Sequence, residues 1–262
     1  NPSGRLTDTV AYSVEDHPST ESFGTYEYEG GGYYVEYLEG IYVGYRYFET
    51  FAKDKVQFPF GYGISYTTFE KELVSYDIGE DVITVNVKVT NTGDVAGKET
   101  VQVYYSVPYT EGGIEKSAIC LGGYGKTAML EPNESETVKV EVRIKDMMSY
   151  DKNNLEAWIL EKGDYKIILG ENVREHIDSF TYTVENDVVV KYDDVSGNEI
   201  KNLFDFAYSD FTILSRSDIE NTYPAARQLV ATEDILNPDK LPEPITEGEV
   251  PKTSVVYDEP IM

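Results

Sequence analysis

The sequence predicts a mainly β protein whose central part, residues 70–185, folds as a two-sheet β-sandwich. Apolar and polar residues alternate in a series of segments there, and a period of two is the pattern of a strand with one buried face. Runs rich in Gly, Asn, Pro and Glu separate these segments and are typical of turns. Short strands spaced in this way over about 110 residues favour a sandwich of the immunoglobulin or fibronectin kind.

Each predicted strand of the sandwich shows the same alternation. The segments are DVITVNVKVTN, ETVQVYYSV, ETVKVEVRI, DYKIILGE and DSFTYTVE. The turn signals between them are NTGDVAGK, EGGIEK, EPNES and EKGD.

The first part of the chain, residues 1–69, is rich in tyrosine and glycine. Its stretch EGIYVGYRYF predicts a strand with bulky side chains on both faces, as in a sheet that is covered on both sides. We expect Gly44 to allow a close approach of a backbone or ring, and Arg46 to be buried beside a carboxylate or several carbonyl groups. The next stretch, FPFGYGISYTTF, predicts a tight turn whose rings join two modules.

The last part, residues 186–262, loses the alternation. VVVKYD could add one more strand, and DIENTYPAARQLVA could hold a short helical turn. The run NPDKLPEPITEGEVP is rich in Pro and Glu and contains too few apolar residues to fold alone. It predicts an extended acidic linker that leads to a following domain.

Composition excludes several classes of partner. Lys plus Arg number 22 and Asp plus Glu number 48, so the net charge of −26 disfavours nucleic acid and anionic membranes. The one cysteine, Cys120, allows no intrachain disulfide and lies in an apolar run typical of a core. His17 and His176 lack metal-ligand spacing, so we expect neither a metal nor a cofactor. No membrane span or signal segment is visible, and we expect a cytoplasmic rather than a secreted protein.

Long consecutive stretches resemble glycoside hydrolase family 3. YLEGIYVGYRYFET followed by FPFGYGISYTTF resembles the end of that family's α/β-sandwich domain, and NPSGRLTDT resembles a segment just upstream. VKVTNTGDVAGKETVQVYYSVPY, with LGGYGKTAMLEPNESETVKVEV and GDYKIILG, is similar to the fibronectin type III-like domain that follows in many β-glucosidases. The resemblance covers residues 1–9 and about 34–185.

The resemblance implies a division of the chain into three parts. Residues 1–69 would be the C-terminal part, with the last strands, of an α/β-sandwich domain whose beginning lies upstream of this chain. Residues 70–185 would be the fibronectin type III-like, or immunoglobulin-like, sandwich. Residues 186–262 would be an irregular segment and linker toward a (β/α)8 barrel, as in the circularly permuted members of the family.

The same resemblance implies that the catalytic carboxylates lie outside this chain. Retaining glycosidases need two carboxyl groups about 5–5.5 Å apart. In the family the nucleophilic aspartate belongs to the barrel, and the acid/base glutamate precedes the NPSGRL segment. TILSRSDI resembles the family's Ser-Asp-Trp nucleophile motif, but Ile219 replaces the tryptophan and Arg216 interrupts the apolar approach. A helix-capping role for Asp218 is favoured instead.

Candidate substrate-binding residues are few. Tyr33, Tyr34 and Glu36, with Glu39, could line the rim of a sugar pocket, and the alternative is a glutamate paired with Arg46. The implied partners are a carbohydrate substrate and the remaining parts of a β-glucosidase-like enzyme, in the same chain or in a second one. A homo-oligomer stays open.

Two other functions compete with this interpretation. β-Sandwiches with exposed aromatic residues often bind glycans, so a free-standing carbohydrate-binding or adhesion module is one alternative. A structural spacer between catalytic domains fits residues 70–185 on their own.

Overall fold

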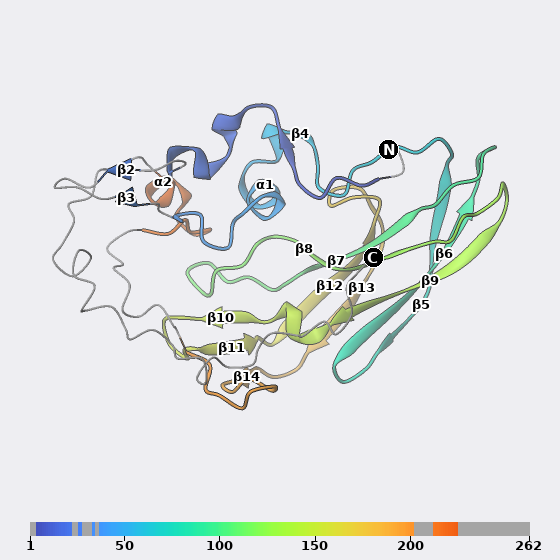
Figure 1. Ribbon diagram of the computed structural model, residues 1–262. Coiled ribbons are helices and arrows are strands. Elements are labelled where there is room, and N and C mark those ends of the chain that lie inside the picture. The colour runs from blue at the N-terminus through green and yellow to red at the C-terminus, as the bar shows by residue number, and fades with distance from the viewer. Residues whose placement is uncertain (1–3, 23–25, 28–32, 35–36, 202–211, 225–262) are drawn as a thin grey trace.

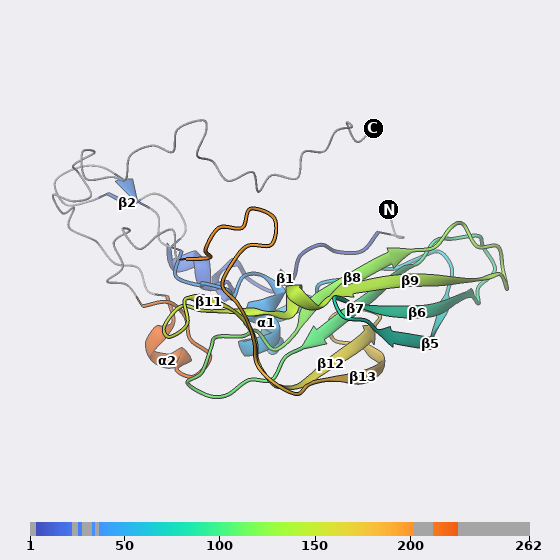
Figure 2. The same cartoon turned by 90° about the horizontal axis from the view of Figure 1, so that it is seen from below.

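The structure of the protein is a computed structural model that describes residues 4–22, 26–27, 33–34, 37–201 and 212–224, and only the backbone of those between 21 and 36 (Figure 1). In Figures 1 and 2 the long strands occupy one half of the molecule, and the helices α1 and α2 lie toward the other. No helix within the described ranges is both long and apolar enough to cross a membrane.

The centre of the molecule is a sandwich of two antiparallel sheets. One sheet has the order β13-β12-β7-β8 and the other the order β5-β6-β9. Their strands are β5 Phe69–Ile78, β6 Val82–Asn91, β7 Thr100–Ser106, β8 Cys120–Lys126, β9 Ser135–Arg143, β12 Gly163–Gly170 and β13 His176–Val184.

The core between the two sheets comes directly from the alternation in the sequence. In β6 every second side chain is buried, and in register with it every second side chain of β9 is buried. The facing strands β7 and β12 contribute a second apolar layer. The main members of this core are Ile83, Val85, Val87, Val89, Val101, Val103, Val138, Val140, Val142, Tyr165, Ile167 and Leu169. All five predicted strands are therefore confirmed.

Two further strands of the sandwich, β5 and β8, were not predicted from the alternation. β5 is mostly exposed and has a register shift between Leu73 and Ser75, so its apolar residues do not keep to one face. β8 reads CLGGYGK, and its glycines lie where the side chains of β9 approach closely.

Smaller elements complete the fold. A three-stranded sheet has the order β10-β11-β14, and two-stranded sheets join β1 to β4 and β2 to β3. Their bounds are β1 Val10–Ala11, β2 Tyr26–Glu27, β3 Tyr33–Tyr34, β4 Val56–Phe58, β10 Ser149–Asp151, β11 Ala157–Leu160 and β14 Val188–Val190. Short 3-10 helices span Val14–Asp16, Pro18–Ser22, Lys53–Lys55 and Ile144–Met147. The extra strand expected in VVVKYD is β14.

The strand predicted for EGIYVGYRYF is wrong, because its second half is the helix α1, Tyr45–Phe51. Gly44 has a φ of 57°, a left-handed value that bends the chain into the first turn of the helix. The helix then buries Tyr47 and Phe48 against Tyr42 in a small aromatic core. Helical packing of these rings replaces the two-sided strand, and Gly44 is the cap of the helix.

The segment 212–224 returns to this aromatic core from the far end of the chain. Leu214 is buried within it, and its backbone N–H donates to the Leu38 carbonyl at 2.8 Å. The predicted helical turn is present as α2, Ile219–Thr222. The predicted linker run NPDKLPEPITEGEVP, residues 237–251, lies outside the described residues.

Candidate functional site

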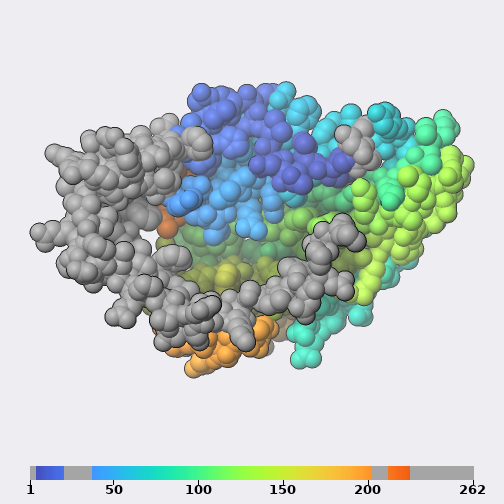
Figure 3. Space-filling model, in the orientation of Figure 1, coloured from blue at the N-terminus to red at the C-terminus, as the bar shows by residue number. Residues whose placement is uncertain are grey.

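The contact surface between residues 4–66 and the outer face of the sheet β13-β12-β7-β8 is called the seam here. Figure 3 shows the N-terminal segment, in blue, lying along one side of the green sandwich. Five consecutive residues of β7 are buried, because its inner face packs in the sandwich core and its outer face lies under this segment.

Aromatic rings form the apolar part of the seam. Tyr104 of β7 is fully buried and packs with Ile168 of β12 on the outer face of the sheet. Phe60 contacts Tyr104 edge to face, with ring centroids 6.4 Å apart, and stacks on Tyr45 of α1 at 4.4 Å. The Tyr45 hydroxyl accepts a hydrogen bond from the Leu121 N–H at 2.9 Å. Of the rings in FPFGYG, Phe60 thus packs against the sandwich, whereas Phe58 and Tyr62 contact each other.

A hydrogen-bonded chain fixes the turn at Gly61. The amide nitrogen of Gln102 donates to the carbonyl of Gly61 at 3.1 Å and to that of Glu171 at 2.9 Å. The Tyr104 hydroxyl donates to the Gln102 amide oxygen at 2.7 Å. Burial raises the pKa of Tyr104 well above its usual range, so the phenol remains a donor. Gly61 has a φ of 80°, and a Cβ there would lie 2.1 Å from that amide oxygen.

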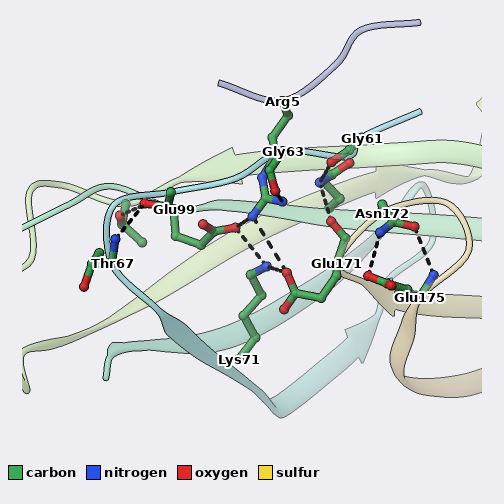
Figure 4. A network of polar contacts seen from close by, with 12 residues as sticks. Arg5, Gly61, Gly63, Thr67, Lys71, Glu99, Glu171, Asn172 and Glu175 are labelled. Atoms are coloured by element: carbon green, nitrogen blue, oxygen red, sulfur yellow. Dashed lines mark hydrogen bonds and ion pairs between the residues drawn. The ribbon is translucent and has the colours of Figure 1, made fainter. Parts of the chain in front are cut away.

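A buried ionic cluster lies beside this turn (Figure 4). The Lys71 amino group is 2.9 Å from a carboxylate oxygen of Glu99 and 2.5 Å from one of Glu171, and its side chain is 0% exposed. Arg5 pairs with Glu99, lies 3.7 Å from Glu171 and donates to the Gly63 carbonyl at 3.5 Å. The cations and carboxylates balance, which makes their burial tolerable. The cluster links the start of the chain to the sandwich.

The burial expected for Arg46 is wrong, and Glu36, one of its predicted partners, lies outside the described residues. Arg46 is exposed, and within the part of the chain that the structure describes it forms no ion pair. The buried carboxylate of α1 is Glu49, whose partner is Arg174, with the two atoms 2.8 Å apart. On α1 the carboxylate of Glu49 is therefore buried toward the sandwich, whereas Arg46 is exposed to solvent.

Glu115 anchors the returning segment 212–224. Its carboxylate accepts hydrogen bonds from the Tyr42 hydroxyl, from the Ser215 hydroxyl at 2.5 Å and from the Arg216 N–H at 2.9 Å. The Arg216 guanidinium also lies over the ring of Tyr109, 4.1 Å from its centroid. Sequence reasoning missed this anchor, because an isolated glutamate in EGGIEK carries no pattern.

The predicted sugar-contacting residues are placed only in part. Tyr33 and Tyr34 form β3, which pairs with β2, and their side chains are not described. Glu36 lies outside the described residues. Glu39 is partly buried, and one of its carboxylate oxygens is buried without a hydrogen-bond partner among the described residues.

Asp218 occupies the cap position of α2. Its carboxylate accepts from the Asn221 N–H at 3.4 Å and from the Asn221 side-chain amide at 2.8 Å. The expected capping role is confirmed. That the chain carries no catalytic residue stays a prediction.

The cysteine and the histidines have structural contacts. Cys120 packs against the core of the sandwich, with its sulfur 3.0 Å from the Ser117 hydroxyl. His17 contacts Phe48 edge to face, and a ring nitrogen of His176 is 3.2 Å from the Val173 carbonyl oxygen. Within the described ranges, no three His, Cys, Asp or Glu residues are grouped so that they could hold a metal ion.

The outer side of residues 4–66 exposes many apolar side chains. The most exposed of these side chains are Tyr12, Val14, Tyr37, Val43, Ile64 and Tyr66.

Comparisons with known proteins identify relatives of both the sandwich and the segment before it. Residues 99–173 match the family described as fibronectin type III-like domain. β-Glucosidase A of Butyrivibrio fibrisolvens is 45% identical over 212 residues, which cover 73% of this chain and 25% of that protein. The β-glucosidase of Ruminococcus albus is 42% identical over 195 residues, covering 73% of this chain and 20% of that protein.

Solved structures show the same relationship. A β-glucosidase from Paenibacillus barengoltzii superposes with a TM-score of 0.66 at 39% sequence identity, over 74% of this chain and 22% of that one. The chain therefore spans a quarter or less of the length of these relatives.

Proposed function

We propose that the chain is the non-catalytic portion of a β-glucosidase of glycoside hydrolase family 3, because 73% of its length matches part of such enzymes. The enzyme hydrolyses terminal β-linked sugars by a two-step retaining mechanism. This portion supplies the scaffold and the domain seam, and it forms part of the rim of the substrate pocket. Homology to enzymes of which the matched part is a quarter or less carries the proposal.

The seam supports the scaffold role. On the sandwich, Gln102 donates a hydrogen bond to Gly61, and Arg174 pairs with Glu49. Lys71 pairs with Glu99, which in turn pairs with Arg5. Interactions of this kind hold two elements in one orientation, because any displacement leaves a buried polar group without its partner. A catalytic domain that continues from residues 4–66 is thereby held fixed relative to the sandwich.

The exposed apolar residues of the N-terminal segment support the proposal that the rest of the enzyme packs against this segment. Such side chains favour burial by about 25 cal/mol for each Å² of apolar surface. The partner we propose is the upstream part of the α/β-sandwich domain, joined to this chain or present as a second polypeptide. The barrel would follow residue 262, as in circularly permuted members.

We place the domain boundaries near residues 69 and 185 and the enzyme in the cytoplasm. The first strand of the sandwich begins at Phe69 and its last strand ends at Val184, which supports both boundaries. The cytoplasmic location rests on the sequence alone.

Hydrolysis of a chromogenic aryl β-glucoside, with intact mass measured on the same sample, tests the proposal. We expect no hydrolysis by the 29.6 kDa chain alone, and hydrolysis by a longer protein, or a two-chain complex, that contains it. Hydrolysis by the chain alone that disappears in Asp218→Asn would overturn the placement of the catalytic carboxylates. Asp77→Asn, which changes an exposed aspartate of β5 away from the groove and the seam, is the matched control.

A further inference from the structure

A groove of about 1010 Å³ lies at the end of the sandwich away from α1 and β4. It is bounded by the turn between β5 and β6, by the end of β9 and by the sheet β10-β11-β14 with the residues after it. In Figure 1 these parts lie together at the lower edge of the molecule. Pockets for small molecules usually measure about 300–1,000 Å³, so this groove has room for a short oligomer.

An aromatic platform forms part of the wall of the groove. Trp158 of β11 is the single tryptophan of the chain, and 42% of its surface is exposed while its neighbours Ala157 and Ile159 are buried. Tyr150 of β10 contacts the indole edge to face, with ring centroids 5.6 Å apart. Tyr192, which is 60% exposed, lines the same groove. Exposed rings at a concave site offer flat apolar faces that favour stacking.

Polar groups beside the rings offer both donors and acceptors. Arg143 pairs with Asp146 at 2.8 Å, and Lys145 pairs with Asp194 at 3.2 Å, both on the rim. The guanidinium has five N–H donors and the carboxylates have several acceptor positions, so each pair retains capacity for a ligand. Asp193 is already held by the Ser196 backbone and hydroxyl, at 2.7 and 2.8 Å.

These features select a neutral, hydroxyl-rich ligand. A sugar ring presents C–H groups on its face, which suit an aromatic ring, and hydroxyls at its edge, which donate to carboxylates and accept from cations. The net charge of −26 and the acidic rim disfavour an anionic ligand. Most acidic groups of the rim already have partners, which lowers the attraction for a cation.

We propose that this groove binds a neutral oligosaccharide chain, with sugar rings stacked on Trp158 and Tyr192 and hydroxyls held by Arg143 and Asp146. The site is separate from the seam and from the candidate rim residues Tyr33 and Tyr34. It does not depend on the proposed catalytic role, because a non-catalytic chain can hold a polysaccharide by itself. Binding there would keep a long glycan near an enzyme that acts on its ends.

The single tryptophan makes the test direct, since all tryptophan fluorescence of the full chain comes from this groove. Cellohexaose, xylohexaose and laminarihexaose are titrated separately into the protein, and a saturable change is expected with at least one. Tyr192→Ala should weaken that binding about fivefold, because a stacked ring contributes about 1 kcal/mol. Tyr124→Ala, which removes an equally exposed ring from β8, should leave the affinity unchanged.

Replacing Trp158 removes the fluorophore, so binding to that variant is measured by calorimetry. Trp158→Ala should abolish the heat of binding while circular dichroism shows an intact sandwich. Salt separates this ligand from a charged one, because binding of a neutral sugar is insensitive to ionic strength. If none of the three sugars changes the tryptophan fluorescence, the proposal is overturned. It is equally overturned if tetralysine binds in their place and salt abolishes that binding, which would assign the groove to a basic peptide.

Discussion

Lys71 is the fully buried cation of the ionic cluster. Its amino group is buried between Glu99 and Glu171, so removing the charge leaves a buried carboxylate with less compensation. We expect Lys71→Met, which keeps the length of the side chain, to lower the free energy of unfolding by about 3–5 kcal/mol in urea denaturation. Lys139→Met breaks an exposed pair with Glu141 and should cost less than about 1 kcal/mol. Equal losses in the two variants would contradict a buried cluster.

Substitutions at Gly61 and Gly112 distinguish the effect of backbone conformation on stability from the effect of close packing. Both have left-handed φ values, 80° and 74°, but a Cβ on Gly61 would meet Gln102 and Tyr104 whereas one on Gly112 would meet nothing within 4 Å. Gly112→Ala should therefore cost about 1–2 kcal/mol through φ alone. Gly61→Ala should cost about 1–3 kcal/mol more, because it displaces the seam side chains. Thermal or urea unfolding of both variants measures the difference, and a Gly61→Ala variant no less stable than Gly112→Ala would refute the close contact.

Single residues also show where sequence interpretation stops. The aromatic residues of the seam were predictable because FPFGYG concentrates rings and glycines in a short span. The partners Glu49 and Arg174 are 125 positions apart, and Ser215 lies 100 positions after Glu115. Pairing over such distances depends on the folded topology, which the local pattern does not contain.

Among the elements, strands were predictable where one face is buried and the other is exposed to solvent. β6 and β9 meet that condition, and their alternation gives both the strand and its inward face. β5 lacks it because its second half is exposed on both faces. α1 was mistaken for a strand because a short aromatic run satisfies a period of two and helical spacing equally well, and only the left-handed Gly44 decides between them.

β8 owes its position to its glycines. A Cβ on Gly123 would lie 2.5 Å from the Glu141 carbonyl oxygen of β9, and backbone atoms cannot rotate away as a side chain can. Gly123→Ala should therefore separate β8 from β9 and lower the free energy of unfolding by about 2 kcal/mol. Tyr124→Ala, on the exposed side of the same strand, should cost under about 1 kcal/mol. If urea denaturation gave the same stability for Gly123→Ala and the unchanged protein, the two sheets would have to meet differently.

In the whole molecule, a segment late in the chain packs against the N-terminal segment, which the sequence did not suggest. Residues 186–262 were expected to leave the sandwich as a linker, yet Leu214 packs with Tyr42 and Phe48 near the start of the chain. The aromatic core of the N-terminal segment is thus built from both ends of the described chain. Apolar contacts of this kind need only a few buried side chains, which leave no periodic signal in an acidic segment.

Buried tyrosines give the whole molecule a dependence on alkaline pH. Burial raises the pKa of Tyr42, Tyr47, Tyr104, Tyr105 and Tyr165 above the usual value. In the unfolded chain these phenols lose their protons near pH 10, at about the unperturbed pKa, whereas in the folded protein they retain them. The unfolded state then binds fewer protons, so stability is complete below about pH 9 and falls as pH rises through 10 and above.

The expected slope is up to about 1.4 kcal/mol per pH unit for each such tyrosine. Urea denaturation at a series of pH values from about 8 to 11, with tyrosinate absorbance followed in the same samples, measures the decline. Tyr165→Phe should make the slope shallower, whereas Tyr124→Phe, which changes an exposed ring, should leave it unaltered. The buried phenols should ionise only as the protein unfolds, because in the folded chain their charged form has no water around it. Tyrosinate absorbance that rises fully near pH 10 without unfolding would show that these rings are accessible to water, and that the seam and sandwich open far more readily than their contacts imply.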